Sequence, residues 1–184
     1  MLVFPQGLIL LSVPKTGSTS LEAAFAPHAL VAVTSIACGR EVSGNTARHK
    51  WGPAEVWGVI RDPFDWVRSW YQYRCTMEFA GTSRFALGRT FEQFVDRWAG
   101  GERMQGNLLD LQSDFLAGAD RVYTFEALGV LAKDLGARLG ATVALPRLNV
   151  SPQQTAYMSD KTADKIRFKA AKDFEIYERL NHAL

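Results

Sequence analysis

The chain has little cysteine and histidine, with two residues of the first kind and three of the second among 184. Cys38 and Cys75 form no C-x-x-C pair, and His49 is eleven residues from the nearer of them. Two cysteines cannot build the disulfide framework of a small secreted domain, and this spacing gives little support to a zinc site. We therefore expect free thiols in a reducing compartment.

The sequence also lacks a strong excess of one charge and any long apolar run. Its formal net charge of +2 is too small to indicate binding to nucleic acid or to a membrane surface. No basic segment precedes the first apolar run, Leu8–Leu11, which is too short to span a bilayer. We expect a cytoplasmic protein without stable membrane insertion or a nucleic-acid partner, folded as a single domain over residues 1–184.

Short apolar runs alternate with segments of helical periodicity along the chain. Strands are predicted at Leu8–Val13, Ala29–Val33, Glu55–Ile60 and Arg121–Phe125. Helices are predicted from Leu21, over Asp65–Tyr73, from Phe91 to Trp98, at Leu108–Leu116, at Leu128–Leu139 and, as one long helix, at Asp160–Leu180. Thr90 and Gln93 have the spacing of a capping box at the start of the third helix, and Gly140 is expected to end the fifth. The polar segments Thr34–Lys50 and Tyr73–Gly88 are predicted loops, the second a candidate flap. This alternation predicts an α/β fold of three α/β/α layers around a central, mostly parallel sheet.

The segment Leu8–Glu22 carries the first candidate site. Its apolar run ends at Pro14, and one lysine, one glycine and four hydroxyl residues follow within Lys15–Ser20. Ser18 or Thr19 is placed to cap the helix that comes next. A strand, a small polar turn and a helix N-terminus form a geometry that binds phosphate or sulfate, because backbone N–H groups and the positive helix end face the anion. The alternative is a hydroxyl-rich turn without a ligand.

A second candidate site follows the strand predicted at Glu55–Ile60. Arg61 lies where that strand ends, which is the edge at which ligands bind in open α/β sheets. Pro63 suits the first turn of a helix, and Ser69 comes about two turns later. A guanidinium fork and a hydroxyl suit a phosphate monoester. Alternatively, Arg61 pairs with the nearby Asp62 or Asp65 and only ends the strand.

The first site departs from the Walker A pattern, G-x-x-x-x-G-K-S/T, because Lys15 precedes Gly17 instead of following a glycine. Pro14–Ser20 instead resembles the 5′-phosphosulfate loop of sulfotransferases that use 3′-phosphoadenosine 5′-phosphosulfate (PAPS), commonly P-K-T/A-G-S/T-S/T-S/L. Arg61–Tyr71 resembles the 3′-phosphate motif of the same family, R-D/N-P-x-D/E-R-x-x-S-x-Y/F. Trp66 stands where that family usually has a second arginine. Arg68 is about 200° away on a helix, so it is not assumed to replace that arginine.

Softer motifs extend the resemblance over most of the chain, at Gln112–Leu116, Val122–Leu128, Leu145–Ser151 and Asp173–Tyr177. The resemblance implies the P-loop NTPase-like sulfotransferase fold. It also implies transfer of a sulfuryl group from PAPS to a hydroxyl or amine of an unidentified small-molecule or glycan acceptor, with release of 3′,5′-ADP. The implied donor-binding residues are Lys15, Thr16, Gly17, Ser18, Thr19 and Ser20 for the phosphosulfate, and Arg61 and Ser69 for the 3′-phosphate.

Catalytic roles follow from the same resemblance. Lys15 is the candidate that stabilises negative charge on the bridging oxygen as the S–O bond breaks. His49 is the candidate base, since several carbohydrate sulfotransferases have a catalytic histidine shortly before the corresponding strand. The alternatives are a solvated His49 with Glu22 or Glu55 as the base. No metal is expected, because no D-x-D/N loop and no convincing Walker B carboxylate are present.

Two other functions stay open from the sequence. One is a P-loop phosphotransferase that uses ATP and Mg²⁺, which would need a carboxylate near Ser18 or Thr19 to hold the metal. The other is a sulfotransferase-like domain that binds a nucleotide without turnover.

Overall fold

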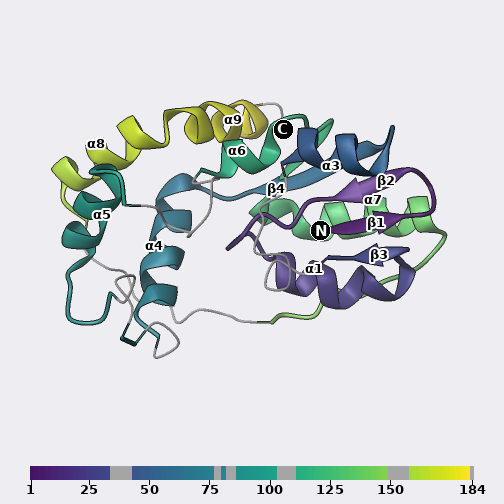
Figure 1. The fold of residues 1–184 in the computed structure, drawn as a ribbon, viewed down its shortest axis with the longest axis horizontal. Helices are drawn as coiled ribbons and strands as arrows, with labels where there is room; N and C mark the ends of the chain where they lie inside the picture. Colours follow the sequence, from purple (N-terminus) through teal and green to yellow (C-terminus); the bar gives the residue numbers. More distant parts are fainter. Residues whose placement is uncertain (34–42, 77–79, 82–85, 103–110, 149–157, 183–184) are drawn as a thin grey trace.

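The computed structural model describes residues 1–33, 43–76, 80–81, 86–102, 111–148 and 158–182. Within these ranges the chain forms a five-stranded sheet in the order β3-β1-β2-β4-β5 (Figure 1). The strands are β1 (Leu2–Phe4), β2 (Leu8–Leu10), β3 (Val31–Ala32), β4 (Glu55–Ile60) and β5 (Arg121–Thr124). Helices and strands alternate along the chain, so the α/β class is confirmed.

The sheet is mixed, whereas a mostly parallel sheet was expected. Strands β2, β4 and β5 run parallel, but β1 is antiparallel to both β2 and β3. The prediction began the first strand at Leu8 and so missed β1, which pairs Leu2 with Leu10 across a tight turn. That turn contains Gly7 in the left-handed region, at a φ of 66°. A connection this short allows an antiparallel hairpin and excludes a parallel crossover.

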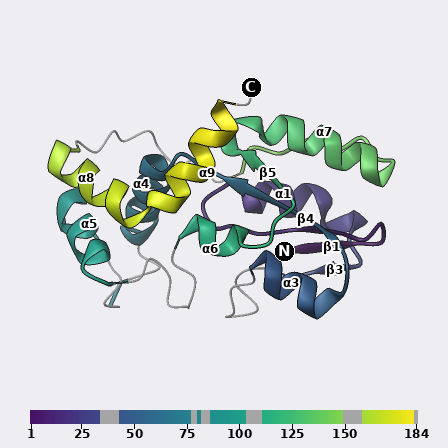
Figure 2. The same ribbon diagram turned by 90° about the horizontal axis from the view of Figure 1, so that it is seen from above.

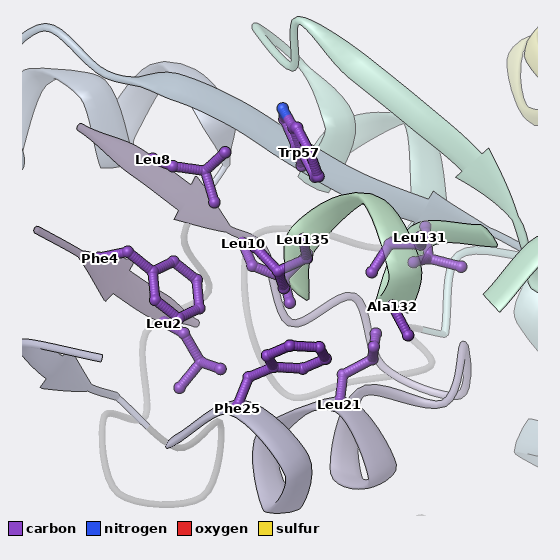
Figure 3. Close-up of a cluster of buried hydrophobic side chains, with 11 residues drawn as sticks. Leu2, Phe4, Leu8, Leu10, Leu21, Phe25, Trp57, Leu131, Ala132 and Leu135 are labelled. Atoms are coloured by element: carbon purple, nitrogen blue, oxygen red, sulfur yellow. The ribbon is translucent and has the colours of Figure 1, made fainter. Parts of the chain in front are cut away.

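Helices cover both faces of the sheet. On one face α1 (Ser18–Phe25) and α7 (Leu128–Leu139) pack on the strands, and their apolar side chains meet those of β1, β2 and β4 in one buried cluster (Figure 3). On the other face lie α3 (Gly44–Trp51), α6 (Gln112–Leu116) and α9 (Ala171–Asn181). All three residues of β2 are buried, as expected for a strand covered on both sides.

A third group of helices extends beyond the end of the sheet. Helices α4 (Pro63–Arg74), α5 (Phe91–Ala99) and α8 (Asp160–Lys169) pack together there (Figures 1 and 2). Their shared core is aromatic and includes Trp66, Trp70 and Trp98. The predicted capping box at Thr90 and Gln93 is confirmed and begins α5.

Two segment predictions are wrong. The predicted loop Thr34–Lys50 contains most of α3, whose cap is the Ser43 hydroxyl accepting from the Thr46 N–H. Its buried residues are only Gly44 and Ala47, so no apolar periodicity marks this helix in the sequence. The predicted long terminal helix is two helices, α8 and α9, which meet at the buried Ala170. No proline or glycine marks that break.

Other predictions lie partly outside the described residues, namely the loop at 34–42, the flap at 77–79 and 82–85, and the segments 108–110 and 149–152. Among the helices of the described ranges, none has the length and apolar character needed to cross a membrane.

Candidate functional site

The turn between β2 and α1 has an unusual backbone. Lys15 has a φ of 66°, the one positive φ of a non-glycine residue in the described ranges, and Gly17 has a φ of 81°. Holding a lysine in this region costs on the order of 1–3 kcal/mol, which the surroundings must supply. At Gly17 a side chain is also excluded by space, since a Cβ would lie 2.8 Å from Leu128 Cδ1. Gly17 is itself the N-cap of α1, so neither Ser18 nor Thr19 caps the helix as predicted.

Two side chains from the following strand and helix hold the carbonyl groups of this turn. The indole Nε1 of Trp66 donates to the Pro14 carbonyl at 2.9 Å. The guanidinium Nη1 of Arg61 lies 3.5 Å from the Lys15 carbonyl, a longer and weaker contact. Trp66 lies on α4, and Arg61 lies two residues before this helix begins.

Two further carbonyls, those of Val13 and Gly17, are bonded locally. The buried Thr16 donates its hydroxyl to the Val13 carbonyl at 2.8 Å, and the Gly17 carbonyl accepts the Ser20 N–H at 3.0 Å. No cis peptide is present in the described ranges, and in a trans peptide the C=O of one residue and the N–H of the next point in opposite directions. The N–H groups of Lys15 and Thr16, which follow the carbonyls of Pro14 and Lys15, therefore point away from Trp66 and Arg61. Successive N–H groups of this kind form an anion-binding concavity.

The two cations of the site rest on aromatic rings. Lys15 Nζ lies 4.2 Å from the ring centroid of Tyr73, and the guanidinium of Arg61 lies 4.7 Å from that of Phe125. Among the described residues Arg61 forms no ion pair within 4.0 Å. Its side chain thus stays available for an anion.

The nearby carboxylates have other partners, so the alternative in which they neutralise Arg61 is wrong. Asp62 caps α4 by accepting the Asp65 N–H at 3.0 Å, and Asp65 pairs with Arg68 at 3.1 Å. Burial raises the pKa of Asp62. The pair with Asp65 also keeps Arg68 away from the role of a second phosphate ligand.

Ser69 lies on the face of α4 that meets the turn. Trp66, Ser69 and Tyr73 are spaced i, i+3 and i+7 on this helix, which places them on one side. Trp66 contacts Pro14 and Tyr73 contacts Lys15, so the buried Ser69 lies between two residues that touch the turn. The structure therefore brings Lys15–Ser20, Arg61 and Ser69 to one edge of the molecule.

The predicted hydroxyl ligands differ in whether they already form hydrogen bonds within the protein. Ser20 is 8 % exposed, and its Oγ accepts the Leu148 N–H at 3.2 Å. The hydroxyl of Thr16 is bonded within the turn. Ser18 is half-buried and Thr19 exposed in the first turn of α1, where the positive end of the helix lies.

Two residues that sequence reasoning placed only in softer motifs support the position of Arg61. The buried Gln112 binds both backbone groups of Arg61: Oε1 accepts its N–H at 2.8 Å, and Nε2 donates to its carbonyl at 2.9 Å. Asp173 in turn accepts the N–H groups of Gln112 and Ser113 at 3.1 and 2.8 Å. Burial raises the pKa of Asp173. Helices α9 and α6 thus fix the end of β4.

The structure does not bring His49 to this site. His49 is exposed on α3 next to Arg48, which bonds Asp120 and the Ala54 carbonyl at the amino end of β4. The six residues of β4, at about 3.3 Å each, separate that end from Arg61 by roughly 20 Å. His49 therefore lies at the opposite edge of the sheet, and its expected position beside Lys15 is wrong.

The two carboxylate alternatives are divided between the same two edges. Glu55 begins β4 and pairs with Arg138 at 3.1 Å, so it lies with His49 at the amino edge. Glu22 is on α1, one turn after Ser18. Its carboxylate accepts the hydroxyl of Ser12 at the carboxyl end of β2 and pairs with the N-terminal ammonium of Met1 at 3.3 Å. Of the three predicted bases, Glu22 alone lies at the same edge as the turn between β2 and α1.

Comparison with protein-family models gives no match, and comparison with curated protein sequences gives none either. The function is therefore inferred from the residues and their geometry.

Proposed function

We propose that the chain is a PAPS-dependent sulfotransferase with a P-loop NTPase-like sulfotransferase fold. The observation that carries the proposal is the turn between β2 and α1, in which Trp66 and Arg61 contact the Pro14 and Lys15 carbonyls, so that the N–H groups of Lys15 and Thr16 point away from those two side chains. Lys15 lies in this turn, and Arg61 ends the neighbouring parallel strand. Together they provide two anion sites at one sheet edge, as a nucleotide with phosphates at its 3′ and 5′ positions requires.

The residues present suit this donor. The N–H groups of the turn and the hydroxyls of Ser18 and Thr19 would hold the 5′-phosphosulfate at the positive end of α1. Arg61 and Ser69 would hold the 3′-phosphate. When bound, PAPS supplies the sulfuryl group that the acceptor takes up in exchange for a proton, with 3′,5′-ADP as the second product.

Lys15 has the catalytic role in this proposal. Its ammonium group would stabilise the negative charge that grows on the oxygen of the leaving 3′,5′-ADP, more strongly in the transition state than before it. The contact with the Tyr73 ring keeps the ammonium beside the turn without neutralising it. Glu22 is the residue proposed to take the acceptor proton, because its carboxylate lies at the same edge.

Thermal unfolding with added nucleotides tests the donor assignment. We expect 3′,5′-ADP to raise the melting temperature clearly more than 5′-AMP or ATP with Mg²⁺, since a ligand that binds the folded state stabilises it. Equal stabilisation by 5′-AMP would contradict the role of Arg61 and Ser69. Stabilisation by ATP with Mg²⁺ alone would favour a phosphotransferase.

Release of 3′,5′-ADP from PAPS tests the activity itself. We expect release to depend on an acceptor when sugars, phenols and amines are supplied in turn. Tight binding of 3′,5′-ADP without release under any of them would identify a nucleotide-binding domain instead of an enzyme.

A further inference from the structure

We infer that Trp66 is a positioning residue, whose indole N–H sets the orientation of the peptide between Pro14 and Lys15 so that this peptide can bind the 5′-phosphate group. The inference rests on the proposed function, because it names the group that the turn receives. Its physical basis is the hydrogen bond of 2.9 Å from Trp66 Nε1 to the Pro14 carbonyl.

The donor itself is rigidly held. Trp66 is completely buried, and its ring packs edge-on against Trp70 with the centroids 6.1 Å apart and an interplanar angle of 83°. A buried side chain packed in this way has few alternative rotamers. The indole therefore fixes the carbonyl direction of Pro14, and the trans peptide then fixes the N–H of Lys15 on the opposite side.

The turn needs such an external support. Lys15 occupies a left-handed conformation that its own side chain disfavours, and Pro14 has no N–H with which to form a competing turn. The second external contact, from Arg61, is longer at 3.5 Å. Trp66 is thus the stronger of the two supports, and it is uncharged, so it holds the turn without competing for the anion.

The chain offers a matched pair of variants. Trp66→Phe keeps an aromatic ring and removes the N–H donor. Trp70→Phe makes the same change four residues later on α4, where the buried Nε1 has no hydrogen-bond partner among the described residues. Both variants lose the same atoms from the same cluster, so a general loss of packing affects both.

Isothermal titration of both variants with 5′-AMP, 3′-AMP and 3′,5′-ADP tests the inference. For Trp66→Phe we expect the affinity for the two nucleotides with a 5′-phosphate to fall about tenfold, as loss of one buried hydrogen bond allows, and that for 3′-AMP to change less than twofold. Trp70→Phe should change none of the three by more than about twofold. An equal loss for 3′-AMP, or an equal loss in Trp70→Phe, would show a structural role only and overturn the inference.

Amide hydrogen exchange provides a test without a nucleotide. In Trp66→Phe we expect the amides of Ser20 and Leu21, which both donate to the Gly17 carbonyl, to exchange about tenfold faster than in the wild type, with no such change in Trp70→Phe, because only the first variant releases the turn. If the wild type binds none of the nucleotides, the proposed function fails. Unchanged exchange at Ser20 and Leu21 in Trp66→Phe would then separately overturn the role of Trp66.

Discussion

The two edges of the parallel part of the sheet use their charges differently. At the amino edge of β4 and β5, cations pair with carboxylates: Arg48 with Asp120, Arg138 with Glu55 at 3.1 Å and Arg121 with Asp134 at 3.6 Å. At the carboxyl edge Glu22 and Asp65 are paired too, but Lys15 and Arg61 lie on the rings of Tyr73 and Phe125. A ring attracts a cation but leaves its charge in place. Under the proposed function these two cations receive the anionic ends of the donor.

The largest effect is expected at Lys15. Lys15→Ala should lower the rate of sulfuryl transfer about a thousandfold, because it removes a charge aimed at the leaving oxygen, while 3′,5′-ADP binding falls less than tenfold. Rates of 3′,5′-ADP release and titration calorimetry measure the two quantities. Lys50→Ala is the matched control, since Lys50 also lies on a ring, 5.0 Å from that of Trp51, but on α3. Loss of binding with an unchanged rate per bound complex would contradict the role of Lys15.

The support of Arg61 can be removed at Gln112. Gln112→Leu should lower the free energy of unfolding by about 3 kcal/mol, because both backbone groups of Arg61 lose a partner in a poorly hydrated place. Urea unfolding measures the change. Ser113→Ala is the control: its hydroxyl lies beside Asp173 and contacts neither backbone group of Arg61, so we expect about 1 kcal/mol or less. Similar values for both variants would show that the hydrogen bonds between Gln112 and the Arg61 backbone add little to the free energy of unfolding.

The charge of Arg61 has its own test. Arg61→Gln should weaken binding of 3′,5′-ADP about thirtyfold and that of 5′-AMP less than threefold, since only the first ligand carries a 3′-phosphate. Calorimetric titration of both ligands gives the ratio. Arg68→Gln should leave both affinities unchanged, because Arg68 pairs with Asp65. A loss of selectivity in Arg68→Gln instead would move the 3′-phosphate site along α4.

The amino edge should show a smaller, pH-dependent effect on stability. The hydrogen bond from the Val56 N–H, aided by Arg48, lowers the pKa of Asp120 from its ordinary value of 3.8. The ionised form is therefore favoured by folding, and its contribution is present above pH 3.8 and lost as the pH falls through the folded pKa. Asp120→Asn should cost less than about 1 kcal/mol at pH 7, because the pair is exposed. Urea unfolding at decreasing pH, from 7 to below 3.8, should show this difference shrinking, and a constant difference would contradict it.

The smallest effect is expected at His49. His49→Ala should change the rate of sulfuryl transfer less than twofold, because His49 lies at the other edge of the sheet. Rates of 3′,5′-ADP release measure the change. A fall of a hundredfold would return His49 to the mechanism and require a different arrangement of α3.

Sequence reasoning found those parts of the fold that local patterns determine. The strand Glu55–Ile60, the capping box at Thr90 and the glycine stop at Gly140 each carry their signal within a few residues. It missed β1, whose three residues are too few to show a period. It also missed the break at Ala170, because tertiary packing alone draws α8 and α9 to different partners.

The sequence predicted which residues form the candidate site, but not the contacts that hold them in place. The sequence alone identifies Lys15–Ser20, Arg61 and Ser69. They meet at one edge because β2 and β4 are parallel neighbours. The hydrogen bonds that join Trp66 to Pro14 and Gln112 to Arg61 connect residues far apart in sequence, so no local pattern predicts them. His49 was misplaced for the same reason, because its position depends on how α3 packs.

The contacts of Trp66 and Arg61 with the turn between β2 and α1 have a consequence for the order of folding. The groups that orient the turn follow it by 46 and 52 residues, within α4 and just before it. Contacts between residues that far apart require the intervening chain to be ordered, whereas helices form from local contacts, so the turn gains its final shape late. We expect a refolding chain to recover its helical signal before it recovers the ability to bind a phosphate group.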